Sequence, residues 1–156
     1  METFDIIKFR VNGTTHPVPE SEILAAEKSL RCKFPDEYRR FVQKYGPGIF
    51  RPLPVQVFSP QQILRFTPEN RQRLEEYWFW DESPEILTKE DALRSIACFD
   101  TDIGHDIRFL PEDPSTFFVL WHEEETIARC DGFAGIVRLL DPDYESQVYD
   151  FKALNV

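Results

Sequence analysis

Three aspartates that could bind a metal stand close together in the second half of the chain. Asp100, Asp102 and Asp106 lie in a segment rich in turn-forming residues. Their oxygens could converge on Ca²⁺, which prefers hard oxygen ligands. The spacing does not match an EF-hand loop, because Gly104 and Glu112 are out of register with that motif. Acidic residues between strands usually form turns and keep their charge in water, so we expect no metal here.

The histidines and cysteines could form a zinc or acid–base site only through contacts that the sequence does not reveal. His105 and His122 lack the His-x-x-x-His spacing of a zinc helix. The three cysteines are far apart in sequence, which favours reduced, buried thiols over disulfides. The chain also has no glycine-rich phosphate loop and no nucleophile elbow. We therefore expect no catalytic residue, no metal and no cofactor.

The densest acidic cluster is Glu123-Glu124-Glu125, which is typical of an exposed hairpin tip. The formal net charge is −10, and it is unevenly distributed. Residues 1–80 hold 12 basic and 10 acidic residues, whereas residues 81–156 hold 6 and 18. This balance disfavours a nucleic-acid or membrane partner and would attract a basic protein.

These acids therefore have two interpretations. Asp100, Asp102, Asp106 and Glu123 to Glu125 could form one patch that binds a basic protein partner. Alternatively, they only keep the protein in solution.

A run of aromatic residues, Tyr77-Trp78-Phe79-Trp80, is the second candidate for partner binding. Tyr and Trp dominate the energetics of protein interfaces. Four consecutive aromatic residues cannot all face one side of a helix. We expect Trp78 in the core and treat Trp80 as a candidate contact with a partner.

The periodicity of apolar residues changes from helical to alternating near residue 95. Predicted helices span residues 22–31, 35–45, 60–64, 67–78, 89–93 and 133–140. Predicted strands span residues 4–11, 53–58, 95–99, 107–110 and 117–122. Helices followed by a strand-rich half indicate an α+β fold with a mainly antiparallel sheet. The length of 156 residues fits a single domain, residues 1–156.

Several side-chain environments follow from these elements. Phe41 lies at the centre of an apolar helical face and should be buried. Glu27 precedes Arg31 by four residues, which predicts an exposed ion pair. The strand over residues 117–122 is apolar on both faces, so it should be central in the sheet and covered on both sides.

The N-terminal residues and the absence of long apolar runs bear on location. The chain begins Met1-Glu2-Thr3-Phe4-Asp5, which lacks the basic start of a secretory signal. No apolar run approaches the roughly 20 residues of a membrane span. We expect a cytoplasmic protein.

The first two predicted helices resemble those of the SUKH superfamily. The matching residues are the Ser21–Leu30 stretch, with Glu27 three residues before Leu30, and the Phe34-Pro35-Asp36-Glu37-Tyr38 helix start. Further matches are the Gly46-Pro47-Gly48 turn, the Gly104–Asp106 turn before Phe109, the Phe118-Val119-Leu120 strand and the Asp131–Leu140 helix. The chain departs from the family pattern at Pro47, at His105 and between Pro60 and Pro84.

The resemblance implies a non-catalytic protein-binding module. In bacteria it implies an immunity protein that binds and neutralises the catalytic domain of a toxin in the producing cell. The alternative is a cytoplasmic regulatory scaffold of the same superfamily, and an enzyme is the third possibility. A toxin gene directly upstream would favour immunity.

Overall fold

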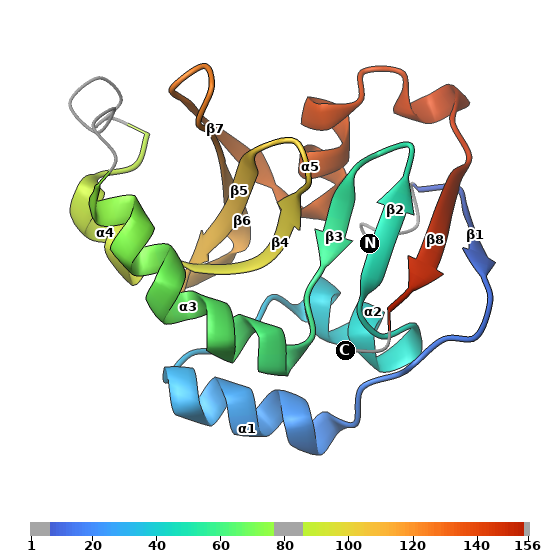
Figure 1. Cartoon of the computed structure of the whole chain (residues 1–156), viewed down its shortest axis with the longest axis horizontal. Coiled ribbons are helices and arrows are strands. Elements are labelled where there is room, and N and C mark those ends of the chain that lie inside the picture. The colour runs from blue at the N-terminus through green and yellow to red at the C-terminus, as the bar shows by residue number, and fades with distance from the viewer. Residues whose placement is uncertain (1–6, 77–85, 155–156) are drawn as a thin grey trace.

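One sheet with helices against both faces organises the chain (Figure 1). The computed structural model describes residues 7–76 and 86–154. The strands are β1 (Phe9–Asn12), β2 (Gly48–Arg51), β3 (Val55–Val57), β4 (Ile96–Thr101), β5 (His105–Leu110), β6 (Asp113–Trp121), β7 (Thr126–Asp131) and β8 (Tyr149–Ala153). The helices are α1 (Glu20–Leu30), α2 (Asp36–Lys44), α3 (Pro60–Glu75), α4 (Lys89–Arg94), α5 (Gly132–Leu140) and a short 3-10 helix (Tyr144–Ser146).

The sheet is almost entirely antiparallel. Its strand order is β1-β8-β2-β3-β4-β5-β6-β7. Only β1 and β8 pair in parallel, at the edge where the two ends of the chain meet. The predicted α+β class with a mainly antiparallel sheet is therefore confirmed.

The larger core lies between the sheet and helices α2 and α5. Phe41 of α2 packs on Phe50 of β2, with ring centroids 5.7 Å apart. Phe133 of α5 lies 5.9 Å from the same Phe50 ring and 5.2 Å from Phe99. Phe41 is 2% exposed, so its predicted burial is confirmed.

A smaller core lies on the opposite face, under α3 and α4. There Leu74 and Ala92 pack with Phe118 and Leu120 of β6. The alternate residues of β6, such as Val119, belong to the larger core. Both faces of β6 are therefore buried as predicted, although β6 is the second strand from the edge.

The corner between α1 and α2 is held by a buried carboxylate. Glu27 is 5% exposed. It accepts a hydrogen bond from the backbone N–H of Phe34 at 2.7 Å and another from Arg39 at 2.5 Å. The predicted exposed pair with Arg31 is wrong. Arg31 has a left-handed backbone (φ 56°) as the residue that ends α1, and the chain turns back there to bring Phe34 and Arg39 to Glu27.

Two further side chains of α2 connect it to distant elements. The carboxylate of Glu37 accepts the backbone N–H of Phe133 at 3.1 Å, in the first turn of α5, where a negative charge stabilises a helix. The hydroxyl of Tyr38 donates to the carbonyl of Phe58 at 2.6 Å, just after β3. A single helix thus fixes the positions of α5 and of the start of α3.

The chain forms one continuous helix, α3, where two were predicted. Ser59 and Gln62 form the reciprocal capping box that begins it. Pro68 lies inside the helix and removes one backbone hydrogen bond, at a typical cost of about 3 kcal/mol. The helix continues because one stripe is buried along its whole length. That stripe consists of Ile63, Thr67, Asn70 and Leu74.

Three observed strands were not predicted, namely β2, β7 and β8. The predicted helix over residues 22–31 begins two residues earlier, at Glu20, with Pro19 as its N-cap. Asp131 is the N-cap residue of α5, and its side chain makes no capping hydrogen bond.

Replacing Phe41 with alanine should destabilise the protein by about 3–5 kcal/mol, because it leaves a cavity among Tyr45, Phe50 and Phe151. Urea unfolding measures this loss. A loss below about 1 kcal/mol would contradict the buried position of this ring.

Replacing Glu27 with alanine should cost about 3 kcal/mol or more, since it leaves the Phe34 amide and Arg39 without their shared carboxylate. Glu22 on the same helix is exposed, and Glu22→Ala should change stability by less than about 0.5 kcal/mol. Equal effects of the two substitutions would show that Glu27 does not anchor the corner.

Candidate functional site

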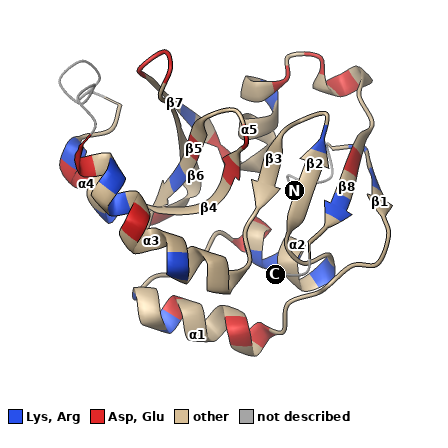
Figure 2. Ribbon diagram, viewed as in Figure 1, with Lys and Arg blue, Asp and Glu red and all other residues tan. Residues whose placement is uncertain are grey.

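Two turns lie side by side at one end of the sheet. The first joins β4 to β5 and the second joins β6 to β7. Since His105 pairs with Trp121 at the adjoining ends of β5 and β6, the turns meet at the same end. We call residues 101–106 and 121–126 the turn end. The charge colouring shows acidic residues in its β6–β7 turn (Figure 2).

The β6–β7 turn presents free acids to solvent. Glu123 and Glu124 are exposed, while Glu125 is partly buried and has a left-handed backbone (φ 56°). Among the described residues no ion pair involves these three glutamates. In the neighbouring turn Ile103 is 57% exposed, which places an apolar side chain at the tip.

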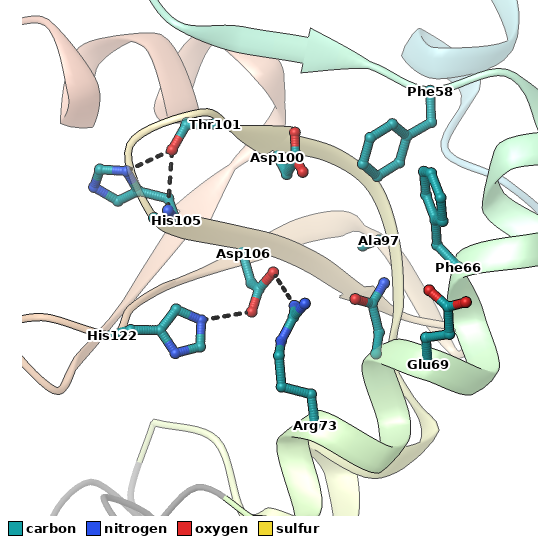
Figure 3. Close-up of a pocket in the computed structure, with 12 residues that line it drawn as sticks. Phe58, Phe66, Glu69, Arg73, Ala97, Asp100, Thr101, His105, Asp106 and His122 are labelled. Carbon is teal, nitrogen blue, oxygen red and sulfur yellow. Dashed lines mark hydrogen bonds and ion pairs between the residues drawn. The ribbon is translucent and has the colours of Figure 1, made fainter. Parts of the chain in front are cut away.

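Asp106 lies below this surface and already has partners in Arg73 and His122. It is 7% exposed. One of its carboxylate oxygens lies 2.8 Å from a guanidinium nitrogen of Arg73, and the other lies 2.7 Å from Nε2 of His122 (Figure 3). Burial alone would raise the pKa of Asp106, but the His122 hydrogen bond and the charges of Arg73 and Arg108 outweigh burial and lower it. Asp106 is therefore an ionised, internally paired carboxylate.

Asp100 has the opposite environment. It stands directly across from Asp106 in the β4–β5 ladder. Burial, together with the negative charge of Asp106, raises the pKa of Asp100 to about 7. Asp102, two residues further, is half exposed and pairs with Arg51 at 2.9 Å. The three predicted aspartates are thus close together but differ in charge and in access to solvent.

His105 faces the α5 side of the sheet. Its ring stacks on Trp121 with centroids 4.7 Å apart. The hydroxyl of Thr101 accepts the backbone N–H of His105 and lies 2.8 Å from its Nδ1. Burial, and to a smaller degree His122, lowers the pKa of His105. Held by Thr101 and by the Trp121 ring, this imidazole stabilises the turn.

A cleft of about 610 Å³ opens between α3 and the β4–β5 hairpin (Figure 3). Its polar lining includes Glu69, Asn70 and Arg73 from α3 and Asp100 from β4, and Phe58 and Phe66 lie on one side. Asp106 and His122 line it as well, so the cleft reaches the turn end.

The structure brings six of the seven predicted partner-binding residues together. Asp100, Asp102 and Asp106 belong to the β4–β5 hairpin, and Glu123 to Glu125 form the adjoining turn. Trp80 belongs to residues 77–85 and lies outside the described residues. Whether any of the seven binds a partner remains a prediction.

Sequence reasoning missed Ile103 and the side chains that α3 supplies. Glu69, Asn70 and Arg73 lie about 30 residues before the hairpin, and no local pattern reveals that they face it. One signal was available. Asn70 is a polar residue on an otherwise regular buried stripe, which often marks a site.

Metal and thiol chemistry have little support in the described parts of the chain. Within residues 7–76 and 86–154, no group of three or more His, Cys, Asp or Glu could hold a metal ion. The three cysteines are free. Burial raises the pKa of Cys32 and Cys130 to about 11 and also raises that of Cys98, so these thiols are protonated at neutral pH.

Comparison with known proteins gave one match. The model of the SMI1 / KNR4 family (SUKH-1) matches residues 17–138, which include α1 to α4, β2 to β7 and most of α5. Searches of curated proteins and of solved structures returned no match.

None of the described helices is both long and apolar enough to cross a membrane.

Asp100 should make stability depend on pH. In the folded protein the carboxyl of Asp100 stays protonated up to about pH 7, whereas in the unfolded chain it loses its proton near the ordinary pKa of 3.8. The contribution of this protonated carboxyl to the free energy of unfolding is therefore fully present below pH 4 and is lost as the pH rises to 7. Asp100→Asn should be more stable than the parent at pH 8, on the order of 2 kcal/mol, and similar to it at pH 4.

Urea unfolding between pH 4 and 8 measures this difference. The control is Asp143→Asn, at an exposed site, whose difference from the parent should be small at every pH. A difference for Asp100→Asn that does not change with pH would contradict the protonation of the buried carboxyl.

Proposed function

This chain belongs to the SMI1 / KNR4 family (SUKH-1), and on that premise we propose that it is a protein-binding module whose turn end receives a basic protein domain. In its more specific form, the proposal makes it an immunity protein. It would bind and neutralise the catalytic domain of a toxin inside the cell that produces the toxin.

The observation that carries this proposal is the composition of the turn end. Glu123 and Glu124 are exposed acids without ion-pair partners among the described residues, and they adjoin the exposed apolar Ile103. Interfaces commonly combine an apolar centre with a charged rim. An apolar tip beside unpaired acids fits a partner surface that is basic around an apolar contact.

The charge of the chain supports a basic partner. The formal net charge is −10, so the protein attracts cationic domains and repels nucleic acid. Toxins that act on nucleic acid need a basic surface to hold the phosphate backbone. An acidic protein bound to that surface would block the substrate and inhibit the toxin without any chemistry of its own.

Rim charges affect the rate of association more than the final affinity. Changing Glu123, Glu124 and Glu125 together to lysine should therefore slow association with a basic partner about tenfold or more at low salt. The difference should shrink as salt shortens the screening length to about 8 Å at 0.15 M. Stopped-flow or biosensor rates at two salt concentrations measure both effects.

The matched control changes the same number of charges elsewhere. Glu22, Glu75 and Glu90 are exposed on α1, α3 and α4, and no ion pair engages them among the residues described. Their triple lysine variant has the same net charge as the turn-end variant. Equal slowing by both would point to net charge alone, and unchanged rates for the turn-end variant would remove the proposed interface.

A further inference from the structure

The cleft beside the turn end is lined by a polar side chain, Asn70, for which the described residues provide no hydrogen-bond partner. Asn70 is 9% exposed and lines the cleft. It lies on the buried stripe of α3, between Thr67 and Leu74. No hydrogen bond involves its side-chain amide within the described residues. Its amide is not one of the fully buried polar groups of the described residues, so it opens into the cleft. The Asn70 amide is therefore available to a group that enters the cleft.

The cleft also has more carboxylates than cations. Asp106 is paired with Arg73 and hydrogen-bonded to His122, so its carboxylate already has partners within the protein. Glu69 and Asp100 line the same cleft, and no ion pair within the described part of the chain engages either of them. Burial and the charge of Asp106 raise the pKa of Asp100 to about 7, because both destabilise its ionised form. A cation that enters the cleft would stabilise that ionised form. The free polar groups therefore suit a cationic ligand.

The apolar part of the lining favours a cation that carries a carbon stem. Phe58 and Phe66 lie on one side of the cleft with ring centroids 5.1 Å apart, and Figure 3 shows Glu69 and Arg73 extending from α3 toward the β4–β5 hairpin. A guanidinium offers five N–H donors in one plane and stacks well on aromatic rings, whereas an ammonium is a compact, strongly hydrated charge. The carboxylates of Glu69 and Asp100 and the carbonyl of Asn70 can accept those donors.

We propose that this cleft binds the guanidinium of an arginine side chain presented by the protein partner. The inference rests on the proposed function, because the cleft shares His122 with the turn end and a partner bound there would reach it. The partner's arginine would insert between α3 and the β4–β5 hairpin. Its aliphatic stem would lie beside the phenylalanine rings, and its guanidinium would displace water from Glu69, Asn70 and Asp100. The exposed glutamates would then speed the encounter, and this arginine would slow dissociation.

The arginine site can be tested without knowing the partner. The isotope-labelled protein is titrated by NMR with the peptide acetyl-Gly-Arg-Gly-amide at pH 8. Saturable shifts are expected at the backbone amides of residues 69–73 and 97–106, with a dissociation constant on the order of millimolar. The same peptide with citrulline in place of arginine is uncharged but has nearly the same shape. It should bind at least about tenfold more weakly.

Three variants locate the binding. Glu69→Gln and Asp100→Asn should each weaken the arginine peptide about threefold or more, because each removes one charged acceptor. Asn70→Leu extends the apolar stripe of α3, so the protein should fold normally while the peptide loses its binding. Glu75→Gln, on the same helix but outside the cleft, should leave the peptide affinity unchanged.

Two outcomes would overturn the arginine site. One is the absence of saturable shifts at the cleft residues, and the other is equal binding of the citrulline peptide. The proposed function fails separately. If the peptide binds but reversal of Glu123 to Glu125 does not alter association with a basic partner, the interface is elsewhere. If that reversal slows association but Asn70→Leu and Asp100→Asn leave partner dissociation unchanged, the turn end binds a partner without the arginine.

Discussion

The carboxylate of Glu27, buried between α1 and α2, is the interaction on which the remaining structure depends. A buried charge is stable only when it is paired and hydrogen-bonded, and Glu27 has both the Phe34 amide and Arg39. This requirement fixes the turn between the two helices and therefore the direction of α2. From α2, Glu37 reaches the first turn of α5, and Tyr38 reaches the end of β3.

The residues of this framework are among those by which the chain resembles its family. Glu27, Phe34, Glu37 and Tyr38 all hold elements together, and all lie away from the turn end. The surface proposed to meet a partner comes from the β4–β5 and β6–β7 turns and from α3. These four residues therefore position the binding surface without forming part of it, whereas the Gly104–Asp106 turn, which also resembles the family, lies within the turn end.

Local patterns predicted the parts of the fold that local interactions determine. The helix α2 and the strands β4 to β6 follow from periodicity and turn residues close to them in sequence. The strand β8 could not be found in this way, because its partners β1 and β2 lie about 100 residues or more before it. The break predicted between residues 64 and 67 was wrong, because burial of a continuous stripe outweighed the hydrogen bond lost at Pro68.

The candidate site likewise combines residues that local sequence patterns reveal with residues that only distant contacts reveal. Sequence reasoning found the acids of the two turns, since they are dense and lie between strands. It did not find that Asp106 is paired with Arg73 and His122, or that Asn70 borders the cleft, because these contacts join α3 to β5 and β6 across the fold. The distinction between a surface acid and a buried, paired one depends on those distant side chains.

The central claim is that the turn end, together with the cleft, forms the binding face. Hydrogen exchange measured by mass spectrometry, on the free protein and on its complex with the cognate basic domain, tests this most directly. The account predicts slower exchange on binding at residues 69–73, 100–106 and 121–126, with little change in α1 and β1. Protection confined to α1, β1 or β8, with unchanged exchange at the two turns, would contradict it.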